Sequence, residues 1–324
     1  MNAMMLSVNN PPYQITANSQ NMTVTVNRFD ENLFDDFIRY LDVGSPKTVD
    51  TYRRELQQFF NYLNINGIAQ PQRADVIAFR ETISKTLKPT TVNNYLTAVK
   101  LFFRWTAYQG LYPNISDHIK ALKIDRNHKK DYLTVNQVKD VMELINTDTM
   151  QGRRDYAIFY LMVTCGLRDI EVSRAKVEDM RLAGENMVLY IQGKGRQEKT
   201  EYVILPDGVE KAIRASLNDR QNITDDSPLF CSLSNNSKGN PLSVQSISGM
   251  IKTRLKKAGL NSDRLTAHSL RHTAVTLSLL GGEDIRNTRD FARHREVTTT
   301  MIYDHSINKS KNTCSRTVNK MIFG

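Results

Sequence analysis

Apolar residues recur every three or four positions through the first third of the chain, which is the spacing of one face of an amphipathic helix. Pro46 and Pro89 each open such a run, and proline is favoured in the first turn of a helix because its missing N–H is not needed there. The pattern predicts helices at residues 29–42, 47–64, 73–85 and 89–109. We expect these segments to pack together as one compact helical domain.

Two of these segments repeat one pattern. The run P-K-T-V-D-T-Y that begins at Pro46 returns as P-T-T-V-N-N-Y at Pro89, and an aromatic pair follows each run at the same distance. Eight matched positions favour a repeated helix over the alternative, which is two unrelated amphipathic helices.

Basic residues lie in or beside the turns that lead into the second and fourth segments. Such residues suit contact with DNA phosphates, but a solvated charged face explains each of them equally well. The candidates for DNA binding are Lys47, Arg53, Arg54, Lys85 and Lys88.

Residues 120–131 are polar, basic and poor in apolar side chains, which is typical of a linker between domains. Helical spacing returns after this linker, so a second domain is expected from residue 132 onward. Two helices are predicted at residues 135–146 and 153–164, and a third starts near Asp169. Further helices are predicted at 207–218, 243–258, 268–280, 284–292 and 296–305.

The spacing changes in one part of this second domain. Residues 187–191 and 200–205 are rich in β-branched and aromatic side chains, and G-K-G-R-Q-E-K separates them. This pattern predicts a β-hairpin with a long, basic tip that holds Lys194. The chain as a whole is therefore predicted to be mainly α with a small antiparallel β-sheet.

Composition narrows the class of protein. The 324 residues give room for two domains, and no stretch approaches the roughly 18 apolar residues of a membrane span. A net charge of +10 favours a polyanionic partner, although general solubility also explains it. Residues 1–27 contain no charged side chain, which excludes the basic start of a secretory signal and indicates a disordered leader. Cys165, Cys231 and Cys314 show neither zinc spacing nor a disulfide framework, which fits a reducing cytoplasm.

The last half of the chain holds the side chains that are needed to break a phosphodiester with a tyrosine. Attack on the phosphate builds a second negative charge, which arginines can balance because they stay protonated and fork two donors onto two oxygens. The reaction also needs an acid for the departing sugar oxygen and a nucleophile that forms a stable ester. The candidates are Arg168, Lys194, His268, Arg271, His294 and Tyr303.

Two of these candidates have neighbours that either support them or could take their role. Glu171 follows Arg168 by three residues and is placed to hold the guanidinium as a support rather than as a catalyst. Lys194 lies between two glycines, which allow a close approach to a phosphate. Lys199 and Arg196 compete with it for the same role.

His268, Arg271 and His272 share one helix face, at spacings of three and four. A metal site there is disfavoured because no Asp, Glu or Cys is spaced to complete it, and Arg271 would repel a cation. Tyr303 by itself would more often be a core residue. With an ordinary pKa of about 10 it needs nearby positive charge to act as a nucleophile, and the basic candidates would supply that charge.

Three short motifs hold most of the candidates: T-C-G-L-R-D-I-E at residues 164–171, G-K-G at 193–195 and H-S-L-R-H at 268–272. In this order, with His294 and Tyr303 after them, they resemble the tyrosine recombinase family, the phage integrase and Xer-type site-specific recombinases. The resemblance extends over residues 29–310 and includes S-P-K-T-V-D-T-Y, which looks like that family's core-binding domain. Arg293 precedes His294 where the family usually has glycine, a departure expected to alter the turn there.

The resemblance implies a mechanism. Tyr303 would attack the scissile phosphate and leave a 3′-phosphotyrosyl ester and a free 5′-hydroxyl. The two candidate arginines would bind the non-bridging oxygens, and Lys194 would protonate the leaving oxygen. His268 would act on the tyrosine proton and His294 would hydrogen-bond the phosphate. The ester retains the bond energy, so neither ATP nor a metal ion nor any other cofactor is expected.

The resemblance also implies a two-domain DNA clamp. Its expected parts are a disordered leader at residues 1–27, a helical core-binding (SAM-like) domain at 28–119, a linker at 120–131 and a tyrosine-recombinase catalytic domain with a C-terminal docking tail at 132–324.

The expected partners are double-stranded DNA recombination sites, with a homotetramer on DNA and a monomer in solution. Accessory proteins are left open, no membrane partner is expected, and the cytoplasm is the expected location. One alternative is a type IB-like topoisomerase that nicks and reseals DNA, and another is a DNA-binding protein with an inactive site. The complete set of catalytic residue types disfavours the inactive protein. The apolar end Met321-Ile322-Phe323 suits docking in a neighbouring protomer and favours the recombinase.

Overall fold

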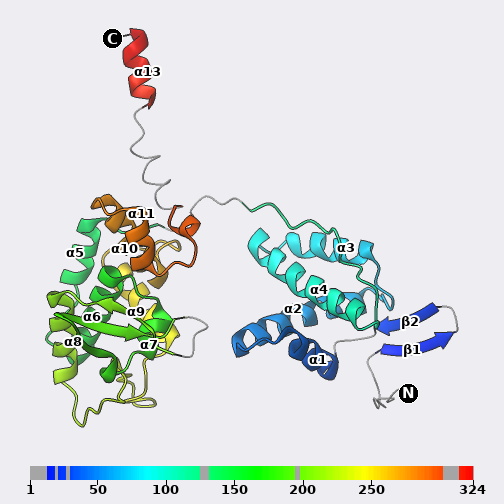
Figure 1. Ribbon diagram of the computed structural model, residues 1–324, viewed down its shortest axis with the longest axis horizontal. Helices are drawn as coiled ribbons and strands as arrows, with labels where there is room; N and C mark the ends of the chain where they lie inside the picture. Colours follow the sequence, from blue (N-terminus) through cyan, green and yellow to red (C-terminus); the bar gives the residue numbers. More distant parts are fainter. Residues whose placement is uncertain are drawn as a thin grey trace. The chain divides into compact units, whose positions relative to one another are not determined.

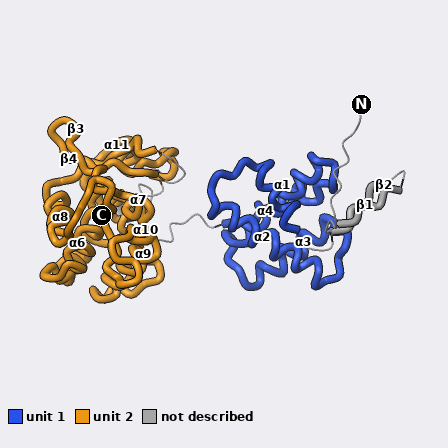
Figure 2. The backbone as a smooth tube through the Cα atoms, turned by 90° about the horizontal axis from the view of Figure 1, so that it is seen from below, with its two compact units in different colours: residues 1–126 blue, residues 127–324 orange. Residues whose placement is uncertain are grey.

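The computed structural model describes residues 13–18, 21–26, 30–124, 131–193, 198–301 and 314–323 (Figure 1). The chain divides into two compact units, residues 1–126 and 127–324 (Figure 2). Each unit has a hydrophobic core of its own. The domain boundaries given by the sequence, with a linker at residues 120–131, stay a prediction.

Helices form the core of the first unit, and their ends lie within two residues of those predicted. Asp30 caps the first helix because its carboxylate accepts hydrogen bonds from the N–H groups of Asn32 and Leu33. Pro46 and Pro89 occupy the first turns of the second and fourth. The helices are α1 (Glu31–Leu41), α2 (Pro46–Ile65), α3 (Arg73–Ser84) and α4 (Pro89–Tyr108), and α4 packs against the other three.

The repeated segments α2 and α4 pack on each other through their aromatic pairs. The rings of Phe60 and Phe102 meet at a centroid distance of 5.3 Å and an angle of 85°. Phe59 and Phe103 meet at 5.9 Å and 89°. Phe59 and Phe60 occupy the repeat positions in α2 that Phe102 and Phe103 occupy in α4, so equivalent residues of the two helices build one core. Edge-to-face pairs of this kind contribute about 0.5–1.5 kcal/mol each beyond their buried area.

The second unit combines helices with an antiparallel sheet. The sheet has the order β3 (Met180–Ala183), β4 (Asn186–Ile191) and β5 (Glu201–Ile204). The sequence predicted β4 and β5 but not β3, which is only four residues long and exposes Leu182. The helices are α5 (Val135–Glu143), α6 (Met150–Cys165), α7 (Asp169–Arg174), α8 (Asp207–Asn218), α9 (Val244–Lys257), α10 (Ala267–Leu280), α11 (Ile285–Ala292) and α13 (Cys314–Phe323), with a 3₁₀ turn at Val177–Asp179 and helical residues at 297–301.

The helix α6 is the central element of this unit. It packs against α5, α7, α8 and α10, and most of its side chains are buried. Gly166 ends α6 in the left-handed conformation, with φ 61° and ψ 32°, which glycine adopts without steric cost. The helix α7 starts at Asp169, so a short turn separates the two helices. The candidate site is assembled around this turn.

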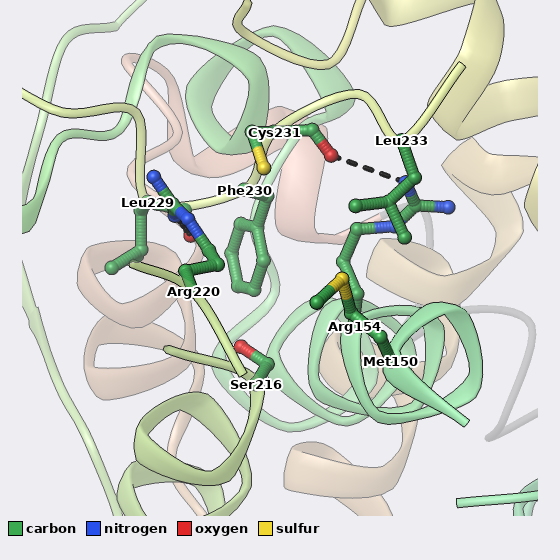
Figure 3. Close-up of a pocket in the computed structure, with 8 residues that line it drawn as sticks. All are labelled: Met150, Arg154, Ser216, Arg220, Leu229, Phe230, Cys231 and Leu233. Carbon is green, nitrogen blue, oxygen red and sulfur yellow. Dashed lines mark hydrogen bonds between the residues drawn. The ribbon is translucent and has the colours of Figure 1, made fainter. Parts of the chain in front are cut away.

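A hydrogen bond connects α6 to the loop around Cys231, and an ion pair connects it to α9. Figure 3 shows the Arg154 guanidinium of α6 donating to the backbone oxygen of Cys231, at 3.1 Å. The same guanidinium pairs with Asp155, whose carboxylate also accepts from Arg254 of α9. Asp155 is 1% exposed and both of its partners are largely covered. This network fixes the core of the unit, and the small pocket beside it is part of the same packing.

The chain start differs from the sequence-based expectation. An antiparallel pair, β1 (Tyr13–Asn18) and β2 (Asn21–Val26), lies where a disordered leader at residues 1–27 was predicted. The alternating T-V-T-V run in β2 explains the difference, because β-branched side chains favour strands. Among the described residues, no helix has both the length and the apolar character needed to cross a bilayer.

Candidate active site

Arg168 is the N-terminal cap of α7 and is held by the carboxylate of Glu171. The backbone N–H of Arg168 donates to Glu171 Oε2, and its side-chain Nη1 donates to Glu171 Oε1, both at 2.8 Å. Glu171 is 1% exposed, whereas the Arg168 side chain keeps 29% of its surface exposed. The carboxylate therefore fixes the direction of a guanidinium that solvent can still reach.

Arg271 of α10 lies against the same turn from the other side. Its Nη1 donates to the backbone oxygen of Gly166 at 2.6 Å, and its Nη2 donates to the backbone oxygen of Ala292. Arg271 is 1% exposed. Both acceptors lie at helix ends, where carbonyl groups have no partner within their own helix. Arg271 thus links α10 to the ends of α6 and α11.

The two histidines of the H-S-L-R-H motif stand in the first turns of α10. The rings of His268 and His272 meet edge to face, with centroids 4.5 Å apart and an angle of 82°. His268 is exposed and His272 is 6% exposed. Only His268 of this pair is therefore open to a substrate.

His294 follows α11, and its Nδ1 lies 2.9 Å from the hydroxyl of the buried Thr300. Burial first, and then the positive charges of Arg271, Arg168, Arg293 and His268, together lower the pKa of His294 to about 4. The ring is therefore neutral at pH 7. Charges act on the ring this strongly only at short range, so the fold brings together four of the six candidates: Arg168, His268, Arg271 and His294.

Sequence reasoning noticed Arg293 only as a departure from glycine and missed its contacts. Its backbone is left-handed, with φ 52° and ψ 45°, a conformation that costs a residue with a side chain about 1–3 kcal/mol. The side chain is 6% exposed and donates to the backbone oxygens of Phe291 and Gly166 and to Glu171 Oε2. Its buried Nε has no hydrogen-bond partner. The sequence feature that could have pointed to these contacts is an arginine directly before the motif histidine, where the family usually has glycine.

Lys194 and Tyr303 both lie outside the described residues, as does Arg196. Lys199, the other competitor for the lysine role, is described: its Nζ is 2.6 Å from Asp179 Oδ2, and the Asp179 side chain is 2% exposed. A lysine held by a buried carboxylate is poorly placed to approach a leaving group. Among the described residues, no group of three or more His, Cys, Asp or Glu side chains could hold a metal ion.

The five DNA-binding candidates of the first unit separate into two kinds. Arg53 pairs with Glu31 and Asp35 of α1, and its guanidinium lies 4.5 Å from the centre of the Phe34 ring. These contacts give Arg53 a structural task between α1 and α2. The side chains that remain exposed are those of Lys47, Arg54, Lys85 and Lys88.

Comparison with known proteins connects this geometry to a family. A model of the phage integrase family matches residues 131–310, and a model of the phage integrase N-terminal SAM-like domain matches residues 33–110. The tyrosine recombinase XerC of Thermodesulfovibrio yellowstonii is 28% identical over 275 residues, covering 81% of this chain and 86% of that protein. XerD of Listeria innocua is 28% identical over 294 residues, covering 85% and 94%.

Solved structures share the fold. The XerH recombinase in a post-cleavage complex with a palindromic difH substrate has a TM-score of 0.69 at 20% identity, covering 89% of this chain and 90% of that one. A lambda integrase dimer on a core site has a TM-score of 0.65 at 16% identity, covering 83% and 96%. At these identities the likeness concerns the fold alone.

Proposed function

The chain belongs to the phage integrase family and is a site-specific DNA recombinase of the tyrosine type, and we propose that Tyr303 is its nucleophile and that Arg168, Arg271, Lys194, His268 and His294 assist it. The observation that carries this proposal is the convergence of both arginines on the Gly166 turn with His294 beside them. The two arginines are thereby held close together as positive charges that can stabilise the negative charge of a phosphate.

The proposed reaction consists of two reversible transfers. Tyr303 Oη attacks the phosphorus, its proton passes to His268, and the bond to the 5′-oxygen breaks. Lys194 donates a proton to that oxygen, which leaves as a 5′-hydroxyl. A 5′-hydroxyl from the partner site then gives its proton to Lys194 and attacks the phosphotyrosine, and Tyr303 leaves and takes its proton back from His268. Each step keeps the number of phosphoester bonds constant, so the exchange needs no external energy source.

A neutral His294 suits its proposed task. If the Thr300 hydroxyl donates to Nδ1, the ring proton sits on Nε2, and this N–H can donate to a phosphate oxygen. Burial first, and then the adjacent positive charges, keep the ring neutral, and the same charges attract the phosphate. Glu171 and His272 are proposed as supports, because Glu171 holds Arg168 and the buried His272 packs against His268.

For the rest of the molecule, we propose a core-binding domain at residues 28–119 and a catalytic domain at 132–324 that together grip double-stranded recombination sites. We further propose a homotetramer on DNA that is monomeric in solution, works in the cytoplasm, and can be aided by accessory proteins. Exposed apolar side chains on α13 support assembly through the tail: Val318, Met321, Ile322 and Phe323 are between 55% and 83% exposed.

A type IB-like topoisomerase is not favoured, since the similar proteins named above are recombinases. The test uses a supercoiled plasmid with two direct copies of an inverted-repeat site taken from the DNA that flanks the gene. The proposal predicts two smaller circles as products, in buffer without ATP. A plasmid that is relaxed but never rearranged would identify a topoisomerase instead.

A further inference from the structure

Arg293 shares one acceptor with each of the two arginines that are proposed to bind phosphate. The Glu171 carboxylate accepts from Arg168 on Oε1 and from Arg293 on Oε2. The Gly166 carbonyl accepts from Arg271 Nη1 at 2.6 Å and from Arg293 Nη2 at 3.1 Å. Arg293 is thus the side chain that joins the two sets of contacts.

The charge balance points in the same direction. Glu171 with Arg168 alone would form a neutral pair, and the carboxylate would compete with a phosphate for the Arg168 guanidinium. With Arg293 as a second partner, the trio has a net charge of +1. Burial alone would raise the pKa of Glu171, but Arg293 first, and then the contacts with Arg168, bring that pKa below its ordinary value. The carboxylate is thereby shared between two cations.

The backbone of Arg293 shows that the side chain is not incidental. Glycine fits the left-handed conformation found at this position, and Arg293 adopts it although a side chain is disfavoured there. The guanidinium is then buried with one nitrogen unpaired. Both features are unfavourable by themselves, so the contacts with Glu171 and Gly166 must compensate for them.

We propose that Arg293 is a positioning residue for DNA cleavage, which holds Glu171 and the Gly166 carbonyl so that Arg168 and Arg271 present their guanidiniums to the scissile phosphate. This inference rests on the proposed function. Arg293 does not touch the substrate and acts through the two arginines. Three segments thereby hold the side chains of the site: the turn after α6, the first turns of α10, and the position between α11 and His294.

The test compares Arg293→Gly with Arg293→Lys and wild type in single-turnover cleavage of a nicked suicide DNA, with DNA affinity measured in parallel. Arg293→Gly relieves the backbone and removes the charge, and cleavage should fall about 10- to 100-fold because small misplacements near the reacting atoms are costly. DNA affinity should change less than about threefold, since DNA affinity is set by many phosphate contacts spread over the protein. Arg293→Lys should cleave at a rate between those of Arg293→Gly and the wild type.

The matched control is Arg289→Ala, which removes an arginine of α11, the helix that Arg293 follows, and this arginine pairs only with its neighbour Asp290 in the described contacts. Its cleavage rate should equal that of the wild type. In a Glu171→Gln background, Arg293→Gly should slow cleavage by a smaller factor than in the native background. The reason is that the ion pair between Arg293 and Glu171 is already lost there, so only the contacts of Arg293 with backbone carbonyls remain to be removed.

A folded Arg293→Gly protein that cleaves at the wild-type rate would overturn the inference, and so would equal losses in affinity and rate. If Arg293→Gly does not fold, Arg293→Lys decides: wild-type cleavage by this variant would overturn the inference, because the shorter lysine cannot place its ammonium where Nη2 meets Glu171 and Gly166 while a second nitrogen holds the Phe291 carbonyl. A wild-type protein that forms no covalent adduct would contradict the proposed function instead, so the two failures are distinguishable.

Discussion

At the scale of single residues, His294 shows how the site uses positive charge. Burial and the surrounding cations lower its pKa from 6.5 to about 4. A histidine with a depressed pKa stabilises the fold above the unfolded value, and this contribution is lost as pH falls through the folded value. The window for His294 is therefore from pH 6.5 down to about 4. Across that window the native protein keeps the ring neutral while the unfolded chain becomes protonated.

The corresponding prediction is a titration of ¹³C-labelled histidine side chains, with His294 assigned by its absence in His294→Gln. The His294 ring should titrate near pH 4 in the free protein and near 6.5 in urea. A native midpoint near 6.5 would show that the ring is not buried among these cations as the structure has it.

Lys194 is the residue whose role most needs a chemical test, because it lies outside the described residues. A general acid is dispensable when the leaving group is a thiolate, which departs without a proton. Lys194→Ala should therefore slow cleavage of a normal 5′-oxygen substrate by about 100-fold or more while a 5′-thio substrate reacts nearly as before.

The matched variant for this test is Lys199→Ala, since Lys199 is held by Asp179. It should keep the wild-type ratio of the two rates. Equal slowing of both substrates in Lys194→Ala would remove Lys194 from the role of acid and make Arg196 the next candidate.

At the scale of elements, the pseudo-repeat of α2 and α4 explains how the first unit is stabilised. Phe59 in α2 and Phe102 in α4 occupy equivalent positions and are both buried. Replacement of either by alanine removes a ring from a packed core and should lower the free energy of unfolding by about 3–5 kcal/mol.

The measurement is urea unfolding followed by fluorescence. Trp105 is the only tryptophan of the chain and is 3% exposed in the core of the first unit, so it reports on this unit. Ile65→Ala is the control, because Ile65 is 83% exposed and its loss should change stability by less than about 0.5 kcal/mol. Losses below about 1 kcal/mol for both phenylalanine variants would contradict the packing of the repeat.

Elements with strong local signals could be predicted from the sequence. Pro46, Pro89 and the apolar period determined α2 and α4 to within a residue, and Gly166 located the end of α6. The strand β3 could not be predicted, since its four residues gain their pairing from β4 and have no period of their own. The contacts of Arg293 depend on Gly166 and Glu171, more than 120 positions away in the chain. Such contacts exist only once the fold brings α11 to the turn after α6.

At the scale of the whole molecule, the net charge of +10 and the two compact units suit a protein that grips DNA. The tail is the part that would connect protomers. Met321, Ile322 and Phe323 on α13 are 83%, 64% and 79% exposed, and burying three such side chains offers about 4–8 kcal/mol before ordering costs. That is enough to favour assembly on DNA without a tight dimer in solution.

Deletion of residues 316–324 should therefore leave single-site DNA binding nearly unchanged while it reduces synapsis and strand exchange. Sedimentation with a two-site DNA measures the assembly directly. Tetrameric complexes that form as readily as with the intact chain would mean that the tail does not connect protomers.

The central claim is that Tyr303 attacks the scissile phosphate. The most direct measurement is a denaturing gel of the protein with a nicked suicide substrate, followed by mass spectrometry of the peptide that retains DNA. The wild-type protein should give a slowly migrating adduct on the peptide that contains Tyr303. Tyr303→Phe should bind the same DNA and give no adduct, because only the phenolic oxygen is lost. An adduct in Tyr303→Phe, or one mapped to another residue of the wild type, would contradict the mechanism.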